Sequence, residues 1–161
     1  MSGDNQDIRV DMEALNAPTV DFFILADHAE AVNGKLYLMG GGWDRIFVSD
    51  FNKSVDIAFA LGVLVPWNAT NMRHTIQITI EDLDRKQPVP FNLSAGFVTG
   101  RPPSITEGET QRALLALSDV SVKFDEPGAY QAIARIVGGH ERRVEFRLVA
   151  LPTVQIQAPK G

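Results

Sequence analysis

Three side chains that could do chemistry stand together early in the chain: Asp27, His28 and Glu30. A histidine with carboxylates at alternate positions can ligate a metal, because residues i and i+2 of a strand point to the same face. Asp27 and His28 are consecutive, however, so a regular strand places them on opposite faces. A half-buried histidine at a strand end is the simpler interpretation, and we predict no metal at this position.

A run of three glycines precedes Trp43 and Asp44. Phosphate-binding loops need such glycines between a strand and a helix N-terminus. Here a strand pattern follows, and the usual Lys-Ser or Lys-Thr is missing. We therefore expect a bulge or a bend with Trp43 packed over it, and no bound cofactor. Asp27, His28, Trp43 and Asp44 remain the candidates for binding a small molecule or an anion.

Carboxylates in turns are a second candidate for ion binding. Asp82 and Asp84, with the more distant Asp44 and Asp50, suggest a calcium site built from loops. Calcium needs about six to eight converging oxygens, so a solvated turn is the simpler interpretation. Nucleophilic catalysis has little support, because the chain has no cysteine and its serines lack a Gly-x-Ser-x-Gly pattern.

Arginines cluster toward the C-terminal end of the chain, at Arg135, Arg142, Arg143 and Arg147. On a solvated face they could bind an anion or an acidic partner. Cross-strand pairing with Glu141 and Glu145 is the simpler expectation.

The elements that must position these residues read as strands. Apolar residues alternate with period two, and no segment keeps the helical period over a helix length. Asn33-Gly34 predicts a tight hairpin turn, and a phase shift near Ser118-Asp119 predicts a bulge. The sequence predicts an all-β, single-domain antiparallel β-sandwich of about eight strands, immunoglobulin-like and of Greek-key type. The expected strands lie near residues 20–29, 35–48, 55–65, 76–80, 91–97, 114–124, 130–136 and 144–150.

Composition restricts the partners. The 161 residues carry a net charge of −5, which argues against binding to nucleic acid. The N-terminus does not read as a secretory signal, and no apolar run is long enough to span a membrane, so we expect a cytoplasmic protein without membrane contact. We expect a mobile acidic arm over residues 1–17, a sandwich domain over 18–152 and a tail over 153–161.

Residues 25–30 (LADHAE) and 34–43 (GKLYLMGGGW) open the ordered part, and residues 127–130 (PGAY) begin its last hairpin. Together, from about Pro18 to Pro152, these segments resemble a family of uncharacterised bacterial β-sandwich proteins known only as a domain of unknown function. The resemblance implies a sandwich with a terminal hairpin. It implies no activity, so no catalytic residue follows from it.

The leading hypothesis is a non-enzymatic domain that acts through protein–protein contacts, as a homo-oligomer or as part of a larger assembly. Its support is a surplus of apolar residues at outer strand positions, which often marks an interface. These residues are Ile133, Val137, Val149 and Leu64, together with Phe23 and Leu25. The alternative is a small-molecule or anion binder, or a hydrolase, with a site near Asp27, His28, Trp43 and Asp44. In a third possibility, the acidic arm or the tail adds a strand to a neighbour.

Overall fold

The computed structural model describes residues 16–152 and 157–160, which form nine strands and one short 3-10 turn. The strands are β1 (Thr19–Val32), β2 (Lys35–Gly41), β3 (Arg45–Val48), β4 (Val55–Val65), β5 (Arg73–Asp82), β6 (Gln87–Val98), β7 (Gln111–Val122), β8 (Gly128–Ile136) and β9 (Glu141–Ala150), and the turn is η1 (Trp67–Ala69). Across these ranges there is no α-helix, and hence none that could cross a membrane.

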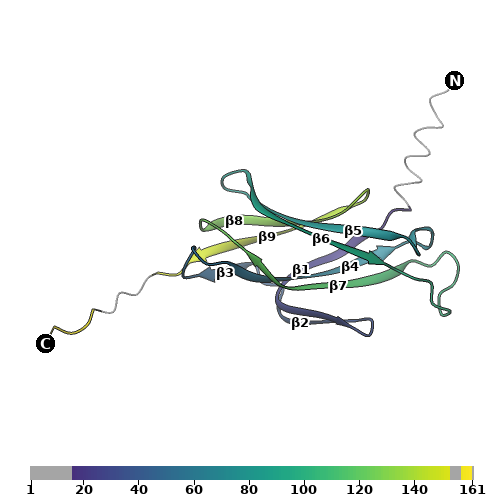
Figure 1. The fold of residues 1–161 in the computed structure, drawn as a ribbon, viewed down its shortest axis with the longest axis horizontal. Helices are drawn as coiled ribbons and strands as arrows, with labels where there is room; N and C mark the ends of the chain where they lie inside the picture. The colour runs from purple at the N-terminus through teal and green to yellow at the C-terminus, as the bar shows by residue number, and fades with distance from the viewer. Residues whose placement is uncertain (1–15, 153–156, 161) are drawn as a thin grey trace, which may run out of the picture.

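Two packed sheets confirm the predicted β-sandwich (Figure 1). Sheet A has the strand order β2-β1-β4-β7, and sheet B has the order β3-β9-β8-β5-β6. Neighbouring strands are antiparallel except β3 and β9, which pair in parallel. The architecture is therefore mostly antiparallel, as the alternating pattern indicated.

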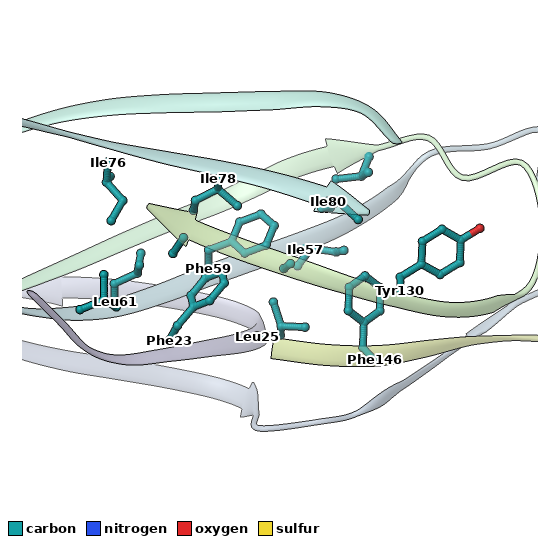
Figure 2. Packing of buried hydrophobic residues seen from close by; sticks show 14 of the residues in the cluster. Phe23, Leu25, Ile57, Phe59, Leu61, Ile76, Ile78, Ile80, Tyr130 and Phe146 are labelled. Atoms are coloured by element: carbon teal, nitrogen blue, oxygen red, sulfur yellow. The ribbon is translucent and has the colours of Figure 1, made fainter. Parts of the chain in front are cut away.

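The core lies between the two sheets. β5 contributes Ile76, Ile78 and Ile80, whose side chains point toward Phe59 and Leu61 of β4 (Figure 2). At one end, Phe124, Tyr130 and Phe146 form an aromatic group; the ring centroids of Phe124 and Tyr130 are 5.0 Å apart. This single buried cluster supplies the main stabilisation of the fold, since burial of large apolar side chains is the dominant favourable term in folding.

β1 is shared between two partners. Residues 19–26 pair with β4, whereas residues 26–32 pair with β2. We call the hairpin made by β2 and the second part of β1 the β1–β2 hairpin. Although it continues sheet A, it bends away from the packed part of the sandwich (Figure 1). Leu36 packs there against a second small cluster made only of alanines, namely Ala26, Ala29, Ala58 and Ala60. Small side chains on the outer side of sheet A thus let the hairpin lie close against it.

The turn chemistry predicted from sequence is confirmed. Asn33 and Gly34 have φ values of 51° and 70°, which a type I′ hairpin turn requires. Asp119 has a φ of 57° and lies next to an irregular register between β4 and β7, where the bulge was expected.

The glycine run does more than bend one strand. β2 ends at Gly41, and after Gly42 the chain crosses to sheet B, where β3 pairs with β9. The segment predicted as one interrupted strand over 35–48 is therefore two strands in different sheets. Of the predicted termini, residues 1–15 and 153–156 lie outside the described residues, so the mobility expected of the arm stays a prediction.

Candidate functional site

Asp27 and His28 lie in the β1–β2 hairpin and face in opposite directions. The carboxylate of Asp27 lies over Gly40, directly across the ladder, where any side chain would collide with it. Gly40 also has a φ of 58°, a conformation that favours glycine. Close packing therefore explains why the first residue of the run is a glycine, and the Asp27 carboxylate lies against the backbone of Gly40.

His28 makes a local contact on the other face of the hairpin. Its Nε2 lies 3.0 Å from Oε1 of Glu30, two residues further along the strand. Within the described residues, no group of three or more metal-ligating side chains comes together. The pairing of positions i and i+2 that suggested a metal thus forms a partly exposed hydrogen bond.

Trp43 and Asp44 belong to the crossing between the sheets. The Trp43 ring packs edge-on against Phe146, with centroids 6.1 Å apart, so it serves the core. Its indole Nε1 is buried and makes no hydrogen bond with any described residue. Asp44 accepts a hydrogen bond from the Arg147 amide through its carbonyl, while 83% of its side chain is exposed. The structure does not gather the four candidate residues around one cavity.

Exposed apolar side chains instead gather on the β1–β2 hairpin. Three cross-strand pairs, His28–Met39, Glu30–Tyr37 and Val32–Lys35, share the face that points away from the sandwich. On this face Tyr37 is 54% exposed and Met39 is 67% exposed. β2 is also the edge of sheet A, so one side of its backbone is unpaired. We call this the hairpin face, defined by Val32, Tyr37 and Met39 with His28, Glu30 and Lys35.

The sequence interpretation missed this face, although its signal was present. Tyr37, Leu38 and Met39 are consecutive, so both faces of β2 carry large apolar residues. A strand of this kind is typically central. Here it lies at an edge, and its second apolar face is left in solvent.

The six apolar residues predicted to form an interface at outer strand positions are mostly buried in the structure. They therefore do not support an interface, and this part of the prediction is wrong. Phe23 and Leu25 belong to the core, and Leu64 and Val149 are half-buried. Ile133 points out of sheet B, yet only 2% of it is exposed. Of this set, only Val137 is a widely exposed side chain.

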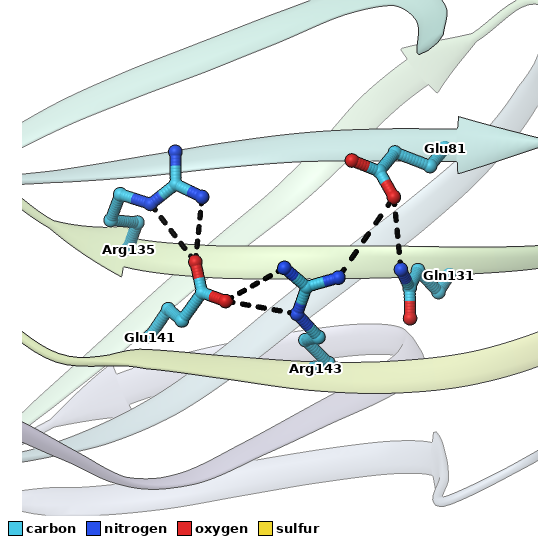
Figure 3. Close-up of polar contacts among 5 residues, drawn as sticks. All are labelled: Glu81, Gln131, Arg135, Glu141 and Arg143. Carbon is cyan, nitrogen blue, oxygen red and sulfur yellow. Dashed lines mark hydrogen bonds and ion pairs between the residues drawn. The ribbon is translucent and has the colours of Figure 1, made fainter. Parts of the chain in front are cut away.

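Charged side chains gather on the outer face of sheet B around Arg143, which lies directly opposite Ile133 on the neighbouring strand; Figure 3 shows these charged side chains. Glu141 accepts hydrogen bonds from Arg135 and Arg143, at 2.6 and 2.7 Å for the shortest contacts, and Glu81 accepts one from Gln131 at 2.9 Å. Hydrogen bonds from Arg135, and then from Arg143, lower the pKa of Glu141. The expected cross-strand pairing is thus confirmed for Arg135 with Glu141, whereas Arg143 pairs with Glu141 within β9, and no ion pair of Glu145 is found among the described residues.

The remaining hollow of interest lies beside the aromatic end of the core. It measures about 170 Å³ and is lined by Asp82, Arg85, Lys123 and Tyr130, among others. Burial acts to raise the pKa of Asp82, but hydrogen bonds from the Arg85 amide and guanidinium outweigh it and lower the pKa. Burial, and then the charge of Asp82, raises the pKa of Tyr130, whose hydroxyl donates to the Glu126 carbonyl at 2.6 Å.

Partners of this kind also account for two of the four carboxylates considered for calcium, Asp82 and Asp84. Both oxygens of Asp82 accept hydrogen bonds from Arg85, and Oδ2 of Asp84 accepts one from the Ala129 amide at 3.0 Å. The turn is therefore held by its own hydrogen bonds, and it presents no converging set of free oxygens.

Fold and surfaces together define a small two-sheet β-sandwich domain with one exposed hairpin face. The chain belongs to a family of unknown function, DUF6941, whose model matches residues 21–149. No curated protein matches the chain.

Proposed function

We propose that this protein is a non-enzymatic interaction domain that binds another protein, or a second copy of itself, through the hairpin face. The observation that carries the proposal is the exposure of Tyr37 and Met39 on an edge strand whose outer backbone groups are unpaired. Such an edge offers hydrogen bonds to an added strand, and the two side chains offer apolar contact.

Comparison with β6, one of the two edge strands of sheet B, supports this choice. β6 carries Pro88 and Pro90, which cannot donate to a further strand. β2 has no proline, and its one charged residue is Lys35 at its first position. Natural edges are usually blocked by prolines or charges, so an unblocked apolar edge favours use as a contact surface. The cytoplasmic address and the bacterial source belong to this proposal and rest on the sequence alone.

The test is the association state of purified full-length protein over a wide concentration range. We expect light scattering to show self-association, or a pull-down to recover a defined partner. The double variant Tyr37→Ser/Met39→Ser should weaken either interaction by at least about tenfold, since each lost apolar contact costs roughly 1 kcal/mol or more.

Met72→Ser is the control, because Met72 is similarly exposed but lies outside the hairpin, just before β5. It should leave association unchanged. A monomer at every concentration with no recovered partner would contradict the proposal, as would a folded double variant that associates like the wild type.

A further inference from the structure

The free edge of β2 presents the backbone groups of alternate residues. Val32 and Lys35 flank a two-residue hairpin turn, which makes them a hydrogen-bonded pair. Hydrogen-bonded and non-hydrogen-bonded pairs alternate along an antiparallel ladder, so Ala29 and Leu38 are a non-hydrogen-bonded pair. The amides and carbonyls of Leu38, and likewise of Leu36, therefore point away from β1.

A contact on the other side of β1 supports this orientation. The amide and the carbonyl of Ala29 both bond to the Ser118 hydroxyl of β7, away from β2. Those of Leu38, directly across the ladder, thus point out of sheet A. Because β2 is an edge strand, no described strand pairs with them. The hairpin bends away from the packed part of the sandwich, which leaves room for another strand along this edge (Figure 1).

We propose, on the basis of the function proposed above, that the partner of the hairpin face is a second copy of this chain. The β2 strands of the two copies pair antiparallel about a two-fold axis at Leu38. The two four-stranded sheets then form one sheet of eight strands, with β2 of each copy at its centre. A two-fold contact of this kind is closed, so assembly through β2 stops at the dimer.

This register brings complementary side chains together on both faces of the new ladder. On the hairpin face, Tyr37 of each copy lies opposite Met39 of the other, and contacts between a thioether and an aromatic ring are favourable. On the opposite face, Leu38, which is 37% exposed, meets Leu38 of the second copy. The whole of β2 takes part, since Lys35 at its start lies opposite Gly41 at its end.

The charges of the hairpin also suit a second copy. Lys35 is the one charged residue of β2, and the antiparallel register holds the two lysines ~20 Å apart, at opposite ends of the ladder. A parallel pairing in register would place them side by side, which is destabilising. On the hairpin face, each row of side chains runs from Glu30 of one copy to His28 of the other, so no like charges face each other. The strand is thus complementary to itself, which favours a second copy over a peptide of another sequence.

The size of the contact sets the expected affinity. A seven-residue edge with these side chains buries roughly 500 Å² on each copy, whereas a standard interface buries about 800 Å² on each partner. We therefore expect a reversible dimer with a Kd in the micromolar range.

Two substitutions at Leu38 test the backbone pairing. Leu38→Pro and Leu38→Ala both remove the leucine side chain, but only proline removes the outward amide, and symmetry makes this two hydrogen bonds per dimer. Proline is tolerated where the amide of an edge strand faces solvent. Sedimentation of the full chain should show that Leu38→Pro weakens dimerisation at least about tenfold more than Leu38→Ala.

Cross-linking tests the register without relying on the proline variant. The chain has no cysteine, so Leu38→Cys introduces a single thiol. At the two-fold axis the two Cα atoms would lie ~5.5 Å apart, within the range of a disulfide. Mild oxidation should link Leu38→Cys into a dimer. Lys35→Cys should link no faster than Met72→Cys, whose exposed position outside the hairpin gives the rate of random collision.

Three outcomes would overturn the proposal: a wild-type protein that stays monomeric, a folded Leu38→Pro variant that dimerises as well as Leu38→Ala, or equal cross-linking of Leu38→Cys and Met72→Cys. The proposed function would survive any of them if Tyr37→Ser/Met39→Ser still weakened binding to another protein or a contact between copies in another geometry. If the double variant also had no effect, the hairpin face itself would be excluded as the contact surface.

Discussion

The aromatic ring of Phe22 lies directly over Gly62 on the outer side of sheet A, where it occupies the space that a side chain at position 62 would need. Gly62 is buried, and its neighbours Leu61 and Val63 face the core. This contact explains a glycine within an otherwise apolar strand, because only a missing Cβ lets the ring approach the backbone.

Gly62→Ala should therefore destabilise the protein. The added methyl group would displace the Phe22 ring, and overpacking of this kind costs about 1–3 kcal/mol. Urea denaturation measures the loss. Gly100→Ala is the matched control, because nothing lies within 4 Å of a Cβ at that position. Equal stabilities for the two variants would refute the packing explanation.

The ion pair of Asp82 and Arg85 predicts how stability depends on pH. Because folding lowers the pKa of Asp82 below its ordinary value of 3.8, the stabilisation is complete above that value and is lost as the pH falls through the lowered pKa. We expect Asp82→Asn to be less stable than the wild type at pH 7, with a difference that shrinks below about pH 4.

Chemical denaturation from pH 7 to pH 2.5 checks this expectation. Asp119→Asn is the control, because Asp119 is exposed and asparagine also tolerates its positive φ. A constant difference between the wild type and Asp82→Asn across this range would show that the ion pair does not carry the effect.

Among the elements, the β1–β2 hairpin depends on one side chain from a strand at the far edge of sheet A. The Oγ of Ser118 in β7 accepts a hydrogen bond from the Ala29 amide at 2.9 Å and donates one to the Ala29 carbonyl at 2.5 Å. A single hydroxyl thus satisfies both backbone groups of a buried residue in β1. It holds the second part of β1 against β7, close to the bulge at Asp119.

Ser118→Ala should make local opening of the β1–β2 hairpin easier, while the stability of the sandwich itself changes less. Leaving the amide and the carbonyl of Ala29 unpaired costs roughly 1–3 kcal/mol for each group that water does not reach. Hydrogen exchange of the amides of β1 residues 27–32 and of β2 should accelerate, while that of β5 stays slow. Ser121→Ala removes an exposed hydroxyl of the same strand and should change neither. If hydrogen exchange accelerated equally in both sheets, the β1–β2 hairpin would not open independently of the sandwich.

Most of the elements could be predicted because their signals are local. The Asn33-Gly34 turn and the bulge near Ser118 follow from backbone preferences and strand parity within a few residues. The crossing of β3 to sheet B was missed, because a period of two defines the faces of a strand but not its partner. The opposing faces of Asp27 and His28 followed from the same parity, whereas the close approach of Asp27 to Gly40 depends on a partner strand.

Across the whole molecule, the sequence was a poor guide to which apolar residues reach solvent. Ile133 has the outward parity predicted for it, but Thr79 and Arg143 lie directly opposite it on the two neighbouring strands, and only 2% of Ile133 is exposed. Long arginine stems cover apolar surface while their charged ends stay in water. Such coverage depends on neighbours brought together by folding. Among the exposed large apolar side chains, Tyr37, Leu38 and Met39 lie on the edge strand β2 and Phe47 lies on the edge strand β3.

The ordered domain begins and ends at opposite ends of the sandwich, since Pro18 packs at the turn before β9 and Leu151 follows the far end of that strand. A protein held at both points would be stretched along its strands. The backbone hydrogen bonds that join β9 to β3 and β8 would then be loaded together in shear, and they would not break one after another. The same domain would therefore resist a force that pulls its two ends apart along the strands better than one that peels a strand from its edge.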